Sequence, residues 1–333
     1  MLYSINSKEI KLFGLINEGM SYNRLPESLM SKLPALSFLG RHPVGGRIAF
    51  RTNAASFKIK CEYVSITMDY SVALASGSSL LVYRGSHKHP LFMGAIYPHS
   101  YNENYFEKEF KKSTYMENIM IFLNRNEEIK SLIIEIPDGA KFEIPDDYEY
   151  KRPVCYFGSS VTEGLSTTLA TNSYPAIISR HLDCDYYNLG FGGAPILDLA
   201  IADFLATINL SAIVLDLDQY SYDIAYLAEA HERFFKRIRA KAPALPIILM
   251  SAPRARYKAS DKKRKNIIKD TYIEALASGD KHVYYVDGEE LYNEDGEFAT
   301  TDGINPNDLG CYNIAIRLEE RIRELLEESR SNG

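Results

Sequence analysis

The hydrophobic pattern of the chain changes near Pro153, and this change restricts the possible folds more than any other feature. From about 46 to 144, apolar and polar residues alternate over short stretches, as in Phe57–Tyr63. Alternation with a period of two is typical of antiparallel strands with one buried face. Leu132–Ile136 shows the same alternation and ends at the turn signal Pro137–Gly139. Two more strand-length runs are Ser79–Tyr83 and Ile119–Leu123.

After Pro153, compact apolar runs alternate with helical segments. Such runs are typical of parallel strands that are buried on both faces. One helical stripe consists of Leu227, His231, Phe234 and Ile238, and another runs from 311 to 325. The sequence therefore predicts a doubly wound α/β layer with a parallel sheet. Its five expected strands are Val154–Phe157, Tyr186–Leu189, Ala212–Leu217, Ile247–Met250 and Val283–Val286.

These two patterns predict two domains, and 333 residues suffice for two hydrophobic cores. We expect residues 1–147 to form a β-sandwich of jelly-roll type and residues 148–333 to form the α/β domain. The charged stretch from Pro145 to Pro153 is the expected linker.

Composition excludes several classes of function. Forty-four acidic and 38 basic residues give a net charge of −6, which argues against nucleic acid as a partner. No run approaches 18 apolar residues, and the first nine residues lack the apolar run of a signal peptide, so neither a membrane span nor export is expected. The four cysteines are widely spaced without a CxxC pair, so we expect no zinc site, no disulfide framework and a cytoplasmic location.

In a doubly wound sheet, ligands bind at the carboxyl ends of the strands, and two loops there stand out. Gly158-Ser159-Ser160 follows the first strand and places Ser160 in the first turn of the next helix, where backbone N–H groups favour a developing negative charge. The alternative is an ordinary turn with a capping hydroxyl. Gly190–Gly193 follows the second strand and offers either a tight turn or an oxyanion N–H. Pro195 replaces the third glycine of a dinucleotide fingerprint, so no nucleotide cofactor is expected.

Asp302-Gly303-Ile304-Asn305-Pro306 precedes the last expected helix. Together with the serine block, the glycine loop and the sandwich in front, this segment resembles the SGNH or GDSL hydrolases. The resemblance is to the branch with an N-terminal jelly-roll domain that includes acetyl-carbohydrate esterases. It implies that Ser160 is the nucleophile, that Gly193 supplies an oxyanion N–H and that Asp302 is the orienting acid. It also implies that the substrate is a small acyl ester, in this branch an O-acetyl ester of a carbohydrate, and that no cofactor or metal is needed.

Two positions depart from the family pattern. Asn305 stands where the family has its catalytic histidine, and Tyr220 stands where it has an oxyanion asparagine, with Gln219 as a neighbouring amide. An asparagine amide is not basic near neutral pH and cannot take the serine proton. Loss of one triad member leaves only about 10³- to 10⁴-fold catalysis over water. We therefore expect an esterase with weak or absent turnover, and the alternative is a degenerate protein that binds a carbohydrate or acyl ligand.

Four further expectations follow from the sequence. Asn305 also suits the N-cap of the last helix, with Pro306 in its first turn. A distant histidine, such as His231 on its apolar helical stripe, could replace the missing base, although a buried structural histidine is the commoner case. Ligand contacts are expected from the tyrosine-rich loop 97–105 and from Arg254 and Arg256, whereas Lys262–Lys265 is expected to be a solvated face.

Overall fold

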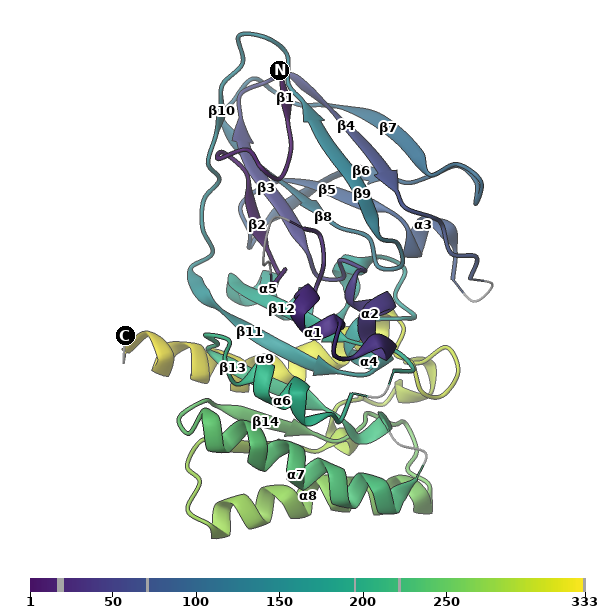
Figure 1. Ribbon diagram of the computed structural model, residues 1–333, viewed down its shortest axis with the longest axis vertical. Coiled ribbons are helices and arrows are strands. Elements are labelled where there is room, and N and C mark those ends of the chain that lie inside the picture. The colour runs from purple at the N-terminus through teal and green to yellow at the C-terminus, as the bar shows by residue number, and fades with distance from the viewer. Residues whose placement is uncertain (17–20, 70–71, 195, 221–222, 332–333) are drawn as a thin grey trace.

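The computed structural model describes residues 1–16, 21–69, 72–194, 196–220 and 223–331. The chain forms an antiparallel β-sandwich followed by a parallel α/β layer, which confirms the predicted fold class (Figure 1). The predicted division at 147/148 remains a proposal. The sandwich strands end at Glu143 and the parallel sheet starts at Tyr150, so the second half of the expected linker is already strand.

The sandwich consists of two antiparallel sheets. The first has the order β1 (Leu2–Tyr3), β9 (Ile129–Glu135), β4 (Ser56–Tyr63), β7 (Tyr105–Lys111). The second has the order β10 (Phe142–Glu143), β3 (Arg47–Thr52), β8 (Glu117–Phe122), β5 (Leu80–Gly85), β6 (Pro90–Ile96), with β2 (Lys11–Phe13) also paired to β3. Three short helices belong to this half: α1 (Glu27–Met30), α2 (Pro34–Gly40) and α3 (Leu74–Gly77).

Strand β4 shows how the sequence pattern produces the sandwich. Its residues alternate between buried and half-buried without interruption, as its alternating apolar and charged residues predict. Ile59 and Cys61 lie in the core between the sheets, whereas Lys58 pairs across the strands with Glu107 at 3.0 Å. The buried face of each strand thus fixes the register of the sheet.

The α/β layer has a five-stranded parallel sheet. Its order is β12 (Cys184–Gly190), β11 (Tyr150–Gly158), β13 (Ala212–Asp216), β14 (Ile247–Met250), β15 (Val283–Val286). Its helices are α4 (Ser160–Glu163), α5 (Tyr174–Leu182), α6 (Leu199–Leu205), α7 (Ile224–Lys241), α8 (Ala259–Ala277) and α9 (Asp308–Ser331). Short 3₁₀ turns lie at Ala170–Asn172, Asp218–Tyr220, Gly288–Glu290 and Gly296–Phe298.

Both faces of the parallel sheet are covered. Cys155 and Phe157 of β11 pack against α6 and α7 in one cluster, whereas Val154 and Tyr156 pack against α5 and α9 in another. This arrangement explains why the strands are continuous apolar runs rather than alternating ones.

The two halves meet through buried arginines of the N-terminal half. The Arg24 guanidinium donates to the carbonyl oxygens of Asn188 (3.3 Å) and Gly190 (2.6 Å) at the end of β12. Arg47 pairs with Asp185 and lies over the Tyr186 ring, 4.1 Å from its centroid. Since both guanidiniums are fully buried, removal of either would leave polar groups of the α/β layer without partners.

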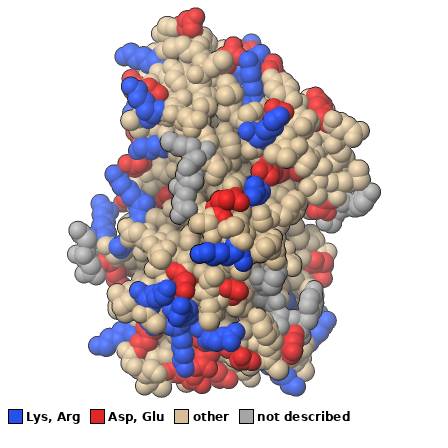
Figure 2. All heavy atoms as spheres, viewed as in Figure 1, with Lys and Arg blue, Asp and Glu red and all other residues tan. Residues whose placement is uncertain are grey.

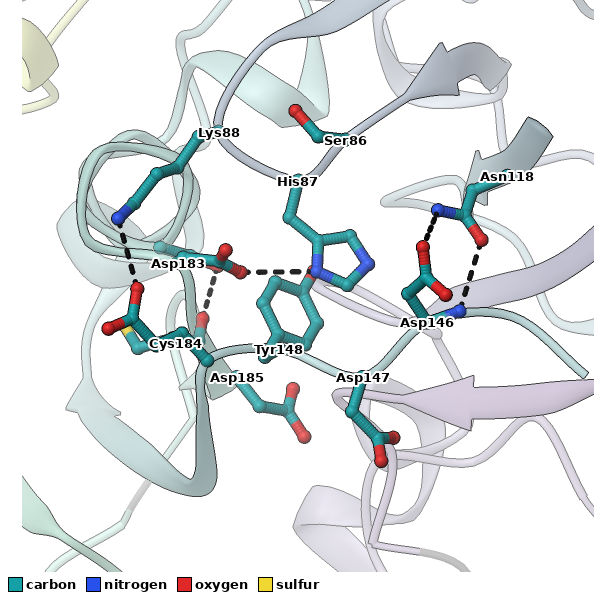
Figure 3. Close-up of polar contacts among 12 residues, drawn as sticks. Ser86, His87, Lys88, Asn118, Asp146, Asp147, Tyr148, Asp183, Cys184 and Asp185 are labelled. Carbon is teal, nitrogen blue, oxygen red and sulfur yellow. Dashed lines mark hydrogen bonds and ion pairs between the residues drawn. The ribbon is translucent and has the colours of Figure 1, made fainter. Parts of the chain in front are cut away.

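A histidine completes this interface (Figure 3). His87, in the turn between β5 and β6, contacts Asp183 through Nδ1 at 3.1 Å and stacks on Tyr148, with ring centroids 4.0 Å apart. The sandwich, the connection between the halves and the α5–β12 corner therefore meet at one imidazole.

Over the face shown in Figure 2, basic and acidic side chains lie among one another. No helix in the described ranges is both long enough and apolar enough to cross a membrane.

The Arg47–Asp185 pair predicts a large effect on stability. We expect Arg47→Ala to lower the free energy of unfolding by about 3–5 kcal/mol, because it leaves a buried carboxylate without its partner. Urea denaturation followed by fluorescence or circular dichroism measures this change. Arg233→Ala, which removes an exposed pair with Glu229 in α7, is the matched control and should change the free energy by less than about 1 kcal/mol. Equal effects of the two variants would contradict this account of the interface.

Candidate active site

Three loops start side by side at the carboxyl edge of the parallel sheet. Gly158, the last residue of β11, lies opposite Gly190 of β12 and Asp216 of β13. The segments that follow these strands contain the serine block, the glycine loop and Gln219. The strand register thus brings residues that are far apart in sequence to one edge.

The two serines of the first loop have different partners. Ser159 is the N-cap of α4, because its Oγ accepts the Val161 N–H at 3.1 Å, and it donates to Asp216 at 3.3 Å. Neither the Ser160 Oγ nor its N–H has a hydrogen-bond partner among the described residues. The capping role that we considered for this turn therefore falls to Ser159. Because α4 has a single turn, its dipole adds little at Ser160.

Asp216 lies directly beneath this turn and is fully buried. Its Oδ2 accepts hydrogen bonds from Thr162 at 2.9 Å and from Ser159. Burial raises the pKa of Asp216 to about 6, since desolvation of the carboxylate outweighs these hydrogen bonds. The loop that carries Ser160 is thus tied to a carboxylate that titrates near pH 6.

The glycine loop packs closely against the serine block. At Gly190, an added Cβ would lie 2.2 Å from the Glu163 nitrogen, so only glycine fits there. Gly192 approaches Ser160, since its added Cβ would lie 3.2 Å from the serine Cβ. Gly193 has a φ of +76°, which suits glycine, and its N–H donates to none of the described residues. The proposed oxyanion donors, the N–H groups of Ser160 and Gly193, are therefore both unoccupied by other acceptors in the described part.

Asp302 and Asn305 form a hydrogen-bonded pair. The Asn305 Nδ2 donates to Asp302 Oδ2 at 2.7 Å, and its backbone N–H donates to Oδ1 at 2.7 Å. Partial burial raises the pKa of Asp302, but the hydrogen bonds from Asn305 outweigh burial and hold that pKa below its usual value. The Oδ1 atom of Asn305 is buried and unpartnered within the described residues. Asn305 thus turns its donor toward the acid and leaves its acceptor free.

The predicted N-cap role of Asn305 is wrong. Helix α9 begins at Asp308, two residues after Pro306. Asn307 caps it instead, because its Oδ1 accepts the Gly310 N–H at 3.1 Å. Hence Asn305 is bonded to Asp302 rather than to the helix.

A cavity of about 380 Å³ lies next to this pair. Asp302 and Asn305 line it together with residues that mostly carry hydroxyl groups, Ser166, Thr167, Thr168 and Thr301 among them, and with Val72, Ala73 and Ser76 of the sandwich half. The tyrosine-rich loop 97–105, which was expected to line the site, contributes nothing to this cavity. The segment around α3 takes its place, because it projects from the sandwich toward the loop after α4.

The third oxyanion position remains open. Gln219 lies in the 3₁₀ turn Asp218–Tyr220, and its Nε2 is buried without a partner in the described part of the chain. The Tyr220 side chain lies outside the described residues. An amide donor next to the family position is therefore present, although among the described residues its Nε2 forms no hydrogen bond with Ser160.

The expected substitute base His231 does not lie at this site. Its Nδ1 contacts Thr271 of α8 at 2.8 Å, and complete burial lowers its pKa to about 4. His87 contacts Asp183, His181 contacts Glu319 of α9 at 2.6 Å, and His42 packs against Phe38. The remaining His89, His99 and His282 are exposed, and no histidine lines the cavity beside Asp302.

One expectation about basic residues needs correction, whereas the expected ligand contacts of Arg254 and Arg256 stay a prediction. Arg264 and Lys265 are not part of a solvated face, since Arg264 pairs with Asp218 at 3.0 Å and Lys265 with Asp287 at 3.1 Å. They anchor the loops after β13 and β15 to α8. Arg254 is largely buried near Asp216, whose pKa its charge lowers, whereas Arg256 forms an exposed pair with Glu297.

Sequence reasoning missed Glu163 and Arg125. Glu163 lies three residues after Ser160, so the two share one turn of α4, and this spacing was the available signal. Arg125 comes from the sandwich half, and no local pattern indicated that it reaches Gly164.

In the described part of the chain, no cluster of three or more histidine, cysteine or acidic residues could hold a metal ion.

Comparison with known families identifies the class of protein. The GDSL-like lipase/acylhydrolase family matches residues 151–323, more than half of the chain, and a second family, the N-terminus of SGNH-hydrolase-type esterases, matches residues 3–142. The chain therefore belongs to the GDSL-like lipase/acylhydrolase family. The resemblance inferred from the sequence is confirmed.

Solved structures show the same fold at low sequence identity. A putative GDSL-like lipase from Bacteroides ovatus is 22% identical, with 98% of each chain covered and a TM-score of 0.88. A salicylyl-acyltransferase from a tetracycline biosynthetic pathway is 15% identical over 97% of this chain and 96% of its own, with a TM-score of 0.78. A family two carbohydrate esterase from Clostridium thermocellum, in complex with cellohexaose, is 14% identical over 87% and 98%, with a TM-score of 0.61. No curated protein matches the chain.

The raised pKa of Asp216 predicts how stability depends on pH. The folded state holds the proton up to about pH 6 and the unfolded state only up to about pH 4, so ionisation at intermediate pH favours unfolding. Relative to Asp216→Asn, the wild-type protein should lose about 2 kcal/mol between pH 4 and pH 6. Urea denaturation of both proteins at several pH values measures this difference.

Asp203→Asn is the control. Hydrogen bonds from Arg237 and Lys241 lower the pKa of Asp203 to about 2, so the folded state keeps this group ionised over the same range, and Asp203 adds only a small slope of opposite sign near pH 4. If the free energies of unfolding of Asp216→Asn and of the wild type change equally between pH 4 and pH 6, burial does not raise the pKa of Asp216 as argued.

Proposed function

We propose that the protein acts on small O-acyl esters of carbohydrates, with Ser160 as the nucleophile and with turnover far below that of a complete triad. The observation that carries this proposal is the Asp302–Asn305 pair. The pair keeps the acid and the orienting hydrogen bond of an esterase triad. The position of the histidine base is occupied by an amide, which cannot accept the serine proton. Membership of the GDSL-like family supports the reaction class.

The geometry suggests how an ester would react. The serine oxygen would attack the acyl carbon, and the carbonyl oxygen would become an oxyanion near the N–H groups of Ser160 and Gly193. The serine proton would have to leave to water, because Asn305 offers only an amide oxygen. Attack would then form an acyl-serine and release the alcohol, and water would hydrolyse the acyl-serine.

Two observations support a carbohydrate as the alcohol. The cavity beside Asn305 is lined by hydroxyl groups, which suit hydrogen bonding to a sugar. Among the similar structures, several are family two carbohydrate esterases, and one is an acetyl xylan esterase from a rumen bacterium. These proteins are only 14% identical to this chain, so their similarity shows the fold and not the substrate. The sugar therefore remains part of the proposal.

A second candidate function is binding without hydrolysis. The buried and unpartnered Oδ1 atom of Asn305 favours it, because this atom can accept a hydrogen bond from a ligand hydroxyl but cannot store a proton. Under this alternative, an acetylated sugar binds and is released unchanged.

Substitution at Asn305 separates the two candidates. We expect the wild type to hydrolyse 4-nitrophenyl acetate and acetylated xylose weakly, Asn305→His to be at least about 10²-fold faster, and Ser160→Ala to be inactive, since a base typically contributes 10²- to 10⁴-fold. Release of nitrophenol or acetate at pH 7–8 measures these rates. Asn305→Gln is the matched control, because it changes the side chain without adding a base.

The outcomes are distinct. A slow wild-type reaction that Ser160→Ala abolishes supports the esterase. Hydrolysis confined to Asn305→His, with calorimetric binding of acetylated xylose by the wild type, supports the binding protein. Equal rates in the wild type and in Ser160→Ala, with no gain in Asn305→His and no calorimetric binding of acetylated xylose by the wild type, would contradict both.

A further inference from the structure

Glu163 lies between the serine turn and the glycine loop. It is the last residue of α4 and is only 6% exposed. Its Oε2 accepts the Gly192 N–H at 2.9 Å. An added Cβ at Gly192 would lie 3.1 Å from this oxygen and 3.2 Å from the Ser160 Cβ. The carboxylate therefore bonds to the glycine loop at the point where that loop meets the serine.

Two successive N–H groups of the glycine loop, those of Gly192 and Gly193, differ in their hydrogen bonding. Glu163 accepts the Gly192 N–H, whereas the next N–H along the loop, that of Gly193, has no acceptor in the described part of the chain. The positive φ of Gly193 turns the backbone at this point. The contact between Glu163 and Gly192 therefore holds the residue that directly precedes the proposed oxyanion donor.

The sandwich half offsets the buried charge. Burial lowers the pKa of Arg125, and the Glu163 carboxylate opposes this effect. The Arg125 Nη1 donates to the carbonyl oxygen of Gly164 at 2.9 Å and also to that of Leu165, so it holds the chain immediately after Glu163. A positive charge from the first half of the chain therefore stabilises Glu163 where it contacts Gly192.

We infer that Glu163 is a positioning residue, which holds the Gly192–Gly193 turn so that the Gly193 N–H faces the oxyanion formed at Ser160. This inference rests on the proposed function. It assigns Glu163 an acceptor role and no part in proton transfer. A glutamine, whose amide oxygen can accept the same N–H, should therefore replace it, whereas alanine should not.

Phenylboronic acid tests this role without turnover. The Ser160 oxygen donates a lone pair to boron, the serine proton passes to solvent, and the adduct becomes a tetrahedral boronate whose oxygen occupies the oxyanion position. Titration calorimetry with ¹¹B NMR measures its affinity and its tetrahedral state. Ser160→Ala should abolish the adduct. Loss of the calorimetric and ¹¹B NMR signals in this variant would show that they arise from boronate bound to Ser160.

Glu163→Ala should weaken phenylboronic acid binding by about 10- to 100-fold, in line with the loss of one oxyanion donor. Glu163→Gln should remain within about threefold of the wild type, because a neutral acceptor is only somewhat weaker than a charged one. Glu229→Ala, which removes an exposed glutamate of α7, is the control for charge and should change nothing. In the Asn305→His background, Glu163→Ala should lower kcat and leave KM unchanged.

Each result has one meaning. If the wild type binds and Glu163→Ala binds equally well, the positioning role is wrong while the proposed function stands. If Glu163→Gln is as weak as Glu163→Ala, the charge matters rather than the hydrogen bond, and the inference also fails. If neither the wild type nor Asn305→His forms a boronate adduct, the proposed nucleophilic site itself is refuted.

Discussion

The arrangement of the site depends on buried guanidinium groups that come from the N-terminal half of the chain. Arg24 donates to the end of β12, immediately before the glycine loop, and Arg125 donates to the carbonyl that follows α4. A buried guanidinium requires acceptors in fixed directions, and here backbone carbonyls of the α/β layer supply them. The sandwich is therefore part of the structure that holds the serine turn and the glycine loop, rather than a separate module.

Within this frame, the proposed site differs from that of a complete esterase at two positions, since Asn305 replaces the base and Tyr220 replaces an oxyanion donor. The serine turn and the glycine loop start at the carboxyl edge of the sheet, and we propose that the hydrogen-bonded Asp302–Asn305 pair acts with them. Asn305 keeps the geometry of a residue oriented by Asp302, but it removes the capacity to accept a proton. Under the proposed function, the lack of a base at position 305 therefore determines whether a bound ester is hydrolysed or released unchanged.

The sequence predicted what depends on local pattern and missed what depends on distant partners. The alternation in β4 and the apolar runs of the parallel strands were sufficient to predict the two kinds of sheet, because each strand must bury its own apolar face. The cap of α9 was placed two residues early, since Asn305 and Asn307 are equally good caps and only the hydrogen bond to Asp302 distinguishes them. Arg125 could not be found, because its contacts are made about 40 residues away along the chain.

Chemical rescue tests most directly whether the site lacks only its base. Asn305→Gly opens space beside Asp302, and added imidazole can then supply the missing proton acceptor. We predict that hydrolysis of 4-nitrophenyl acetate by Asn305→Gly rises with imidazole concentration, reaches saturation and disappears in the Ser160→Ala, Asn305→Gly double variant. An imidazole-dependent rate that is the same in both variants, equal to that of imidazole in buffer, would contradict the account.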